Sequence, residues 1–184
     1  LFTLLVISIL LSILIVKNFS SNFLINTILI SSAIYLFFIT LRDFFSKGFK
    51  NLAQNTAHFG FSLLILSILF NSLFSSEIIT NLKVGQTFEN TKAKIVFESL
   101  SQKEGENYKS IIGNFIVQDS KGKIENLSPE LRIYNQPNIT TSEADIKTTL
   151  LSDKFIVINL VQNQEFFNVR YQVKPFMLWI WISV

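Results

Sequence analysis

Residues 51–74 read NLAQNTAHFGFSLLILSILFNSLF, a mostly apolar run that contains the single histidine of the chain, His58. A helix crosses a bilayer in about 20 apolar residues, so we expect a transmembrane helix over 51–74. The chain has no cysteine and one methionine, which leaves His58 as its only good ligand for a soft metal centre. An ionisable side chain in a membrane helix is a candidate functional residue; a structural histidine at the membrane interface is the alternative.

The composition extends this expectation to the whole chain. A hydrophobic content of 49% and 19 phenylalanines are too apolar for an ordinary soluble domain. Residues 1–16 and 22–41 are predicted as further transmembrane helices, the first of them truncated, and residues 176–184 as the truncated start of a final one. The predicted fold class is a polytopic α-helical membrane protein with an inserted, mostly β extramembrane domain. We expect the chain to be a piece of a larger protein.

Charge predicts the orientation in the membrane. Segment 42–50 holds Arg42, Lys47 and Lys50, whereas segment 75–175 carries as many acidic as basic residues. By the positive-inside rule, 42–50 is a basic cytoplasmic loop and 75–175 is a periplasmic β-rich domain. The predicted location is the bacterial inner (plasma) membrane, with the mitochondrial inner membrane as the alternative. No basic patch is interleaved with aromatic residues, so we expect no nucleic-acid partner.

Segment 75–175 is predicted to form a compact β-sandwich or barrel. Thr140 and Glu143 have the spacing of a capping box, which predicts one short helix after Asn138. Asp119 to Gly122 is a predicted turn. The predicted strands are β-branched and aromatic runs over 94–98, 110–118, 154–161 and 167–173.

The sequence contains no catalytic constellation: it has no second histidine, no thiol and no phosphate-binding glycine loop. Glu130 and Arg132 are two residues apart and would share one face of a strand. We interpret them as a solvated ion pair, worth less than about 1 kcal/mol. The pair Trp179 and Trp181 is typical of an aromatic anchor at a membrane interface.

His58 also lies on a helical stripe of polar residues, whose members Asn51, Gln54, Asn55 and Ser62 are three, four or seven residues away. We interpret the stripe as facing protein, where its amides could orient the imidazole; a frayed helix end at the interface is the alternative. The small residues Ala57 and Gly60 predict the close approach of a neighbouring helix.

Several short motifs occur in an order similar to that of a known family. An Ala-His-x-Gly helix start lies within Leu52–Gly60, and a Gly-x-Asn-Tyr motif is found at Gly105–Tyr108. The other motifs are Val84–Gly85, Pro129–Tyr134, Thr141–Ala144 and Val169–Trp181. Across most of residues 50–184, the chain resembles the carboxy-terminal part of CcmF, the haem lyase subunit of the cytochrome c maturation system.

This resemblance implies a part in attaching haem to apocytochrome c during cytochrome c-type biogenesis. In that family the histidine of the Ala-His-x-Gly helix is an axial ligand to the iron of a transmembrane b-type haem, and the matching residue here is His58. No catalytic residue is implied. The implied partners are the haem chaperone, the thiol-handling partner and apocytochrome c of the maturation system.

The second ligand of haem b is expected from the missing amino-terminal portion. Met177 is excluded as that ligand if the topology holds, because it begins the last helix at the outer surface while His58 begins the third at the inner one. From His58 to Phe74 the helix rises about 24 Å.

Three functions stay open from sequence alone. The first is a carboxy-terminal fragment of a haem lyase subunit; since the outer segment that holds the second haem of that family is not in the chain, whether it is an enzyme is undecided. The second is a non-enzymatic membrane scaffold whose outer β-domain docks partners. The third is a transporter fragment whose polar stripe lines a substrate path.

Overall fold

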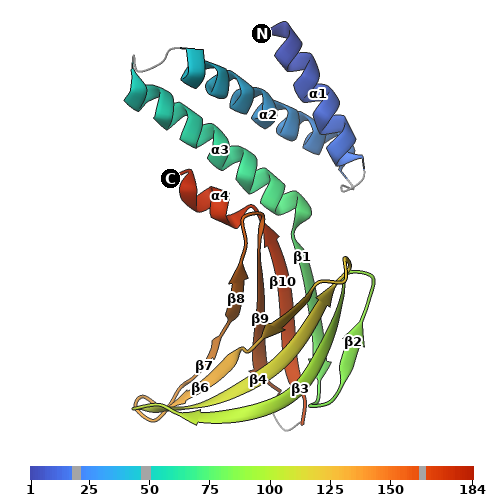
Figure 1. Ribbon diagram of the computed structural model, residues 1–184, viewed down its shortest axis with the longest axis vertical. Helices are drawn as coiled ribbons and strands as arrows, with labels where there is room; N and C mark the ends of the chain where they lie inside the picture. The colour runs from blue at the N-terminus through green and yellow to red at the C-terminus, as the bar shows by residue number, and fades with distance from the viewer. Residues whose placement is uncertain (18–21, 47–50, 162–164) are drawn as a thin grey trace. The chain divides into compact units, whose positions relative to one another are not determined.

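The computed structural model describes residues 1–17, 22–46, 51–161 and 165–184, which form two compact units (Figure 1). The helical unit comprises Leu1–Ser75, Thr149–Ser152 and Lys174–Val184. The sandwich unit comprises Ser76–Thr148 and Asp153–Val173.

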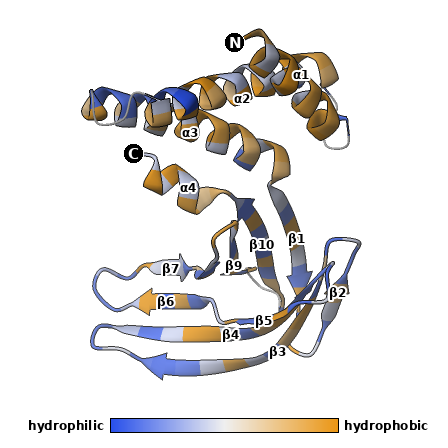
Figure 2. Ribbon diagram, turned by 45° about the horizontal axis from the view of Figure 1, so that its top comes forward, coloured by the Kyte–Doolittle hydropathy of each residue, from blue (hydrophilic) through white to orange (hydrophobic). Residues whose placement is uncertain are grey.

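The helical unit contains four described helices: α1 (Phe2–Val16), α2 (Phe23–Ser46), α3 (Leu52–Phe74) and α4 (Met177–Ile182). Two of them, α2 and α3, are long and apolar enough to cross a membrane, and α1 is a shorter apolar helix (Figure 2). Their hydroxyl side chains bond back to carbonyls one turn earlier, as Ser8 does to Leu4 (2.8 Å) and Thr27 to Phe23 (2.7 Å). Such bonds satisfy polar groups inside an apolar helix.

The predicted loop over 42–50 is wrong in its first half, because α2 continues to Ser46. No glycine or proline interrupts the chain before Gly48, and Arg42 is ion-paired with its neighbour Asp43 at 2.8 Å. Both charges are therefore carried on the last turns of the helix. Lys47 and Lys50 lie outside the described residues.

Within the helical unit, α3 packs against α2 on one side and α4 on another. Thr40 of α2 and Ser62 of α3 share a hydrogen bond of 2.6 Å. Asn71 donates from Nδ2 to the carbonyl of Pro175 (2.6 Å), so α4 begins beside the carboxy-terminal part of α3. A Cβ on Gly60 would lie 2.9 Å from the carbonyl oxygen of Ser183, so the close approach predicted at Gly60 is confirmed.

The sandwich unit is built from two sheets, with strand orders β1-β10-β9-β8 and β2-β3-β4-β6-β7; β5 pairs with β4 outside that path. The strands are β1 (Ser76–Leu82), β2 (Thr87–Glu89), β3 (Ala93–Glu104), β4 (Tyr108–Asp119), β5 (Ile124–Leu127), β6 (Glu130–Tyr134), β7 (Thr140–Glu143), β8 (Asp145–Thr148), β9 (Ser152–Leu160) and β10 (Phe167–Pro175).

Alternation along the strands creates the core of the sandwich (Figure 2). Two side chains of β3, Ile95 and Phe97, are fully buried, and so are Ile156 and Ile158 of β9. Within each strand the two buried residues are two positions apart, so they point to the same face of the sheet. The rings of Phe97 and Phe115 stack with centroids 4.3 Å apart. The four strands predicted by alternation and β-branching are therefore confirmed as parts of β3, β4, β9 and β10.

The short helix predicted from the spacing of Thr140 and Glu143 is wrong, because these residues form β7. The strand pairs antiparallel with β6, with Thr140 opposite Ile133 and Glu143 opposite Glu130. The carboxylate of Glu143 accepts a hydrogen bond from Thr141 at 3.2 Å. Pairing with a neighbouring strand thus outweighs the local capping signal.

Candidate functional site

His58 lies near the amino-terminal end of α3 and is exposed. Two other faces of this helix are occupied: Phe59 packs on Phe37 and Phe44 of α2, with ring centroids 5.6 and 5.7 Å apart, and Gly60 meets the end of α4. His58 lies on a third face, which these two neighbours leave uncovered among the described residues.

The polar stripe predicted around His58 is divided between two faces. Asn55 and Ser62 are buried, at 6% and 0% exposure, and Ser62 bonds to Thr40 of α2. Gln54, like His58, is exposed. Within this chain, therefore, only Asn55 and Ser62 of the stripe are covered by protein, and among the described residues no side chain hydrogen-bonds to the His58 imidazole. The reason is helical geometry: at about 100° per residue, Asn55 and Ser62 lie about 40–60° to one side of His58 around the helix axis, and Gln54 lies about 40° to the other side.

The chemistry of this face fits one axial ligand of a haem. Among the described residues, no side chain hydrogen-bonds to the ring nitrogens of His58. Phe61 and Ile68, three and ten residues further along α3, are 61% and 48% exposed. These side chains, with Ile65 between them, form an apolar surface beside the imidazole. A flat, mostly apolar ring system with a metal at its centre suits such a surface.

Met177 does not lie beside His58. It begins α4 just after Pro175, whose carbonyl is bonded to Asn71 of α3. His58 and Asn71 are thirteen residues apart, a rise of about 20 Å along a helix. The exclusion of Met177 as a second ligand to the same iron thus has support from the packing of α4.

Two motifs of the sandwich come together across one strand pair. Tyr108 lies opposite Tyr134 and Ser110 opposite Arg132 in the pairing of β4 with β6. The ion pair predicted between Glu130 and Arg132 is confirmed at 3.1 Å, and Ser110 also donates to this carboxylate at 2.9 Å. Partial burial raises the pKa of Glu130, but the hydrogen bonds from Ser110 and Arg132 lower it by more. The pKa of Glu130 is therefore below its ordinary value.

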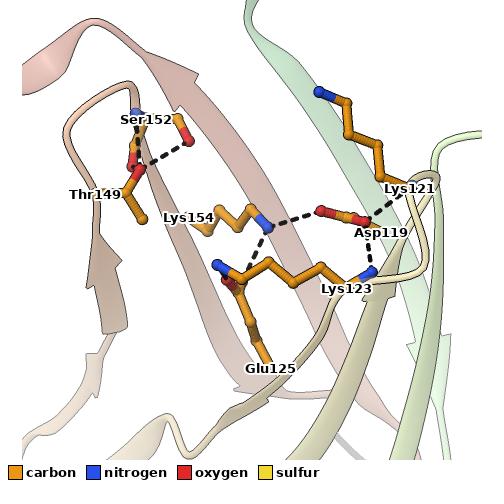
Figure 3. A network of polar contacts seen from close by, with 7 residues as sticks. All are labelled: Asp119, Lys121, Lys123, Glu125, Thr149, Ser152 and Lys154. Carbon is orange, nitrogen blue, oxygen red and sulfur yellow. Dashed lines mark hydrogen bonds and ion pairs between the residues drawn. The ribbon is translucent and has the colours of Figure 1, made fainter.

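A third polar cluster was not predicted from the sequence. Lys154 points into the sandwich from β9 and is only 8% exposed. Its ammonium lies 3.1 Å from Asp119 of β4 and 3.0 Å from Glu125 of β5, so it joins the two sheets (Figure 3). The signal that could have revealed it is the position of Lys154 in the same alternation as the buried Ile156 and Ile158.

The electrostatics of this cluster favour its charged forms. Burial lowers the pKa of Lys154, but hydrogen bonds to Glu125 and Asp119 raise it above the ordinary value. For both carboxyls burial raises the pKa, and hydrogen bonds from Lys123 and Lys154 bring it below the ordinary value. Tyr171, with its buried hydroxyl unpartnered among the described residues, has a pKa raised to about 12, chiefly by burial.

None of these clusters has the composition of a metal site. Among residues 1–17, 22–46, 51–161 and 165–184, no group of three or more histidine, cysteine, aspartate or glutamate side chains could hold a metal ion.

A family model described as "CcmF C-terminal beta-sandwich" matches residues 73–175, which contain all ten described strands of the sandwich. The chain belongs to the CcmF family. Proteins named "Cytochrome c-type biogenesis protein CcmF" are similar to this chain over most of its length. The Pseudomonas aeruginosa protein is 28% identical over 127 residues, which is 69% of this chain and 19% of that relative. The Haemophilus influenzae protein is 29% identical over 151 residues, 78% of this chain and 23% of that relative.

The chain thus spans about a fifth of the length of these CcmF relatives. A solved structure titled "Cytochrome c Heme Lyase CcmF" matches 99% of the chain with a TM-score of 0.68 and 14% identity, and the match covers 32% of that protein. At this identity the match shows a shared fold. The predicted kinship with CcmF and the predicted sandwich are both confirmed.

Proposed function

We propose that this chain forms the carboxy-terminal part of a haem lyase subunit and provides one axial ligand, His58, to a b-type haem held among transmembrane helices. The observation that carries the proposal is the exposed imidazole on a face of α3 that neither α2 nor α4 covers. Membership of the CcmF family supports the same assignment. The second ligand would come from a segment outside these 184 residues.

The residues of this chain would contribute binding and orientation. A bound haem supplies one-electron redox chemistry. His58 would coordinate the iron through one ring nitrogen, and the exposed Phe61 and Ile68 would cover part of the ring and exclude water. The contact of Gly60 with Ser183, together with the hydrogen bond of Asn71 to Pro175, would keep α3 and α4 in register beside it.

In the same proposal α2 and α3 span the inner membrane and the sandwich faces the periplasm. The paired motifs on β4 and β6, with Tyr108 and Arg132 at 5.1 Å in a cation–π contact, are the surface we assign to docking of the haem chaperone, the thiol-handling partner or apocytochrome c. Membership of the CcmF family supports a partner from the cytochrome c maturation system. A photoreactive residue in place of Tyr108 would crosslink to the partner and identify it.

The test of the ligand is spectroscopic. The chain is co-expressed with the remainder of the haem lyase subunit, and the purified membrane complex is examined by its reduced-minus-oxidised spectrum. His58→Ala is expected to abolish the b-type signal, whereas Gln54→Ala, which alters an exposed side chain one turn earlier, retains it. Added imidazole should restore the signal to a His58→Gly variant. An unchanged b-type spectrum in His58→Ala would overturn the proposal and favour a scaffold.

A further inference from the structure

The turn formed by Thr149–Ser152 carries two of the more exposed aliphatic side chains of the molecule. Leu150 and Leu151 are adjacent, uncharged, and 64% and 62% exposed. Isolated exposed leucines are ordinary on a protein surface, but two together at the tip of a turn form an apolar projection.

The turn is closed internally by its polar groups. The hydroxyl of Thr149 donates to the carbonyl of Ser152 (2.7 Å) and accepts from the N–H of Ser152 (3.1 Å) (Figure 3). The N–H of Thr149 donates to the same carbonyl at 2.9 Å. In a weakly hydrated environment, backbone N–H and C=O groups must be hydrogen-bonded within the protein, and these groups of the turn are.

Two further hydrogen bonds attach the turn to α4. Trp179 donates from Nε1 to the carbonyl of Leu150, and the N–H of Phe176 donates to the carbonyl of Leu151, both at 2.9 Å. The tip is therefore held at the level of the first turn of α4, beside an indole ring. Tryptophan is enriched where membrane helices meet the head-group region, because its ring is apolar and its N–H is polar.

We propose that Leu150 and Leu151 insert into the membrane interface, so that the turn is a lipid-contacting anchor on the first turn of α4. This inference rests on the proposed function, in which α2 and α3 span the membrane, and on the prediction that residues 176–184 begin a further transmembrane helix, which packs beside α3. The occupant is lipid rather than protein because the hydrogen bonds fix the depth of the leucines to that of Trp179. In addition, Ile182, three residues after Trp179 and 62% exposed, continues the apolar surface along the same side of the helix.

The experiment uses the absence of cysteine from the chain. Leu151→Cys is labelled with the environment-sensitive fluorophore NBD, and the full chain is reconstituted into phosphatidylcholine–phosphatidylglycerol vesicles that contain a lipid with a shallow nitroxide quencher. Two labelled variants serve as controls: Ile124→Cys on the sandwich and Leu24→Cys on α2, at sites 61% and 75% exposed. We expect a blue-shifted, quenched signal at 151 and 24, and an unshifted, unquenched signal at 124.

Each outcome decides a different point. Quenching at 24 without quenching at 151 refutes the anchor and leaves the membrane placement of α2 intact, whereas no quenching at either site refutes the membrane placement as well. A blue shift at 151 without quenching shows that protein covers the leucines and overturns the inference, and equal quenching at 124 shows non-specific adhesion and also overturns it. Trp179→Phe keeps the ring but loses the N–H donor, so it should reduce the quenching at 151.

Discussion

Replacing the buried cation of the sandwich, Lys154→Met, should destabilise this unit strongly at neutral pH. Methionine keeps most of the volume of the lysine stem while removing the ammonium that lies 3.1 Å from Asp119 and 3.0 Å from Glu125. Removing one partner of a buried ion pair typically costs about 3–5 kcal/mol, because the other charge is left buried without compensation.

The remaining partners of the two carboxylates reduce this cost. Asp119 also accepts from the backbone N–H groups of Lys121 and Lys123, at 2.9 and 3.0 Å, and Glu125 is paired with the Lys123 ammonium at 2.6 Å. We therefore expect a loss of about 2–4 kcal/mol, a large part of the stability of an ordinary domain. The matched control is Lys147→Met, at the exposed residue that lies opposite Lys154 in the pairing of β8 with β9. It should change stability by less than about 0.5 kcal/mol.

The assay is urea unfolding of the full chain in detergent, followed by the β-sheet signal in far-ultraviolet circular dichroism. A carboxyl whose pKa is lowered by folding contributes stability that is present above its unfolded pKa and is lost as the pH falls through the folded pKa. Asp119 and Glu125 are of this kind. The difference between wild type and Lys154→Met should therefore narrow from pH 7 to pH 3. A loss no larger than that of Lys147→Met, or a difference independent of pH, would refute the reasoning.

Three further changes test other parts of the structure. Tyr171→Phe should be neutral or stabilising at pH 7, because the buried hydroxyl has no described partner. Folding raises the pKa of Tyr171 to about 12, so the stability that comes from keeping this phenol protonated is complete below pH 10 and is lost between pH 10 and 12. The variant should lack this alkaline loss of stability in urea titrations. Phe97→Ala should lower the free energy of unfolding by about 3–5 kcal/mol in the same assay, because it removes the ring stacked on Phe115 and leaves a cavity. A smaller loss would show that neighbouring side chains move into the cavity. Gly60→Leu should separate α3 from α4, because even a Cβ would lie 2.9 Å from the Ser183 carbonyl; a disulfide between cysteines placed at 71 and 175 should then form more slowly than in the Gly60 parent, and an equal rate would contradict this packing.

Local patterns were sufficient for the two long apolar helices and for four of the ten described strands. The apolar runs predicted α2 and α3, and alternating β-branched and aromatic residues predicted the strands that carry Phe97, Phe115 and Ile158, because both periodicities are properties of neighbouring residues. The pair Glu130 and Arg132 was predictable for the same reason. The capping signal at Thr140 failed because β6, a strand earlier in the chain, offered pairing that the local sequence does not record.

The sequence by itself therefore determined where the chain is apolar, where it is extended, and that His58 is the one candidate iron ligand. Only the tertiary structure decided which way that side chain faces, because the packing of α2 and α4 determines which faces of α3 remain open. The alternation with Ile156 and Ile158 indicates that Lys154 points inward, but only the tertiary structure decided that it pairs with Asp119, which is 35 residues away and lies on the opposite sheet. Contacts of that separation depend on how the sheets stack, and no local pattern contains that information.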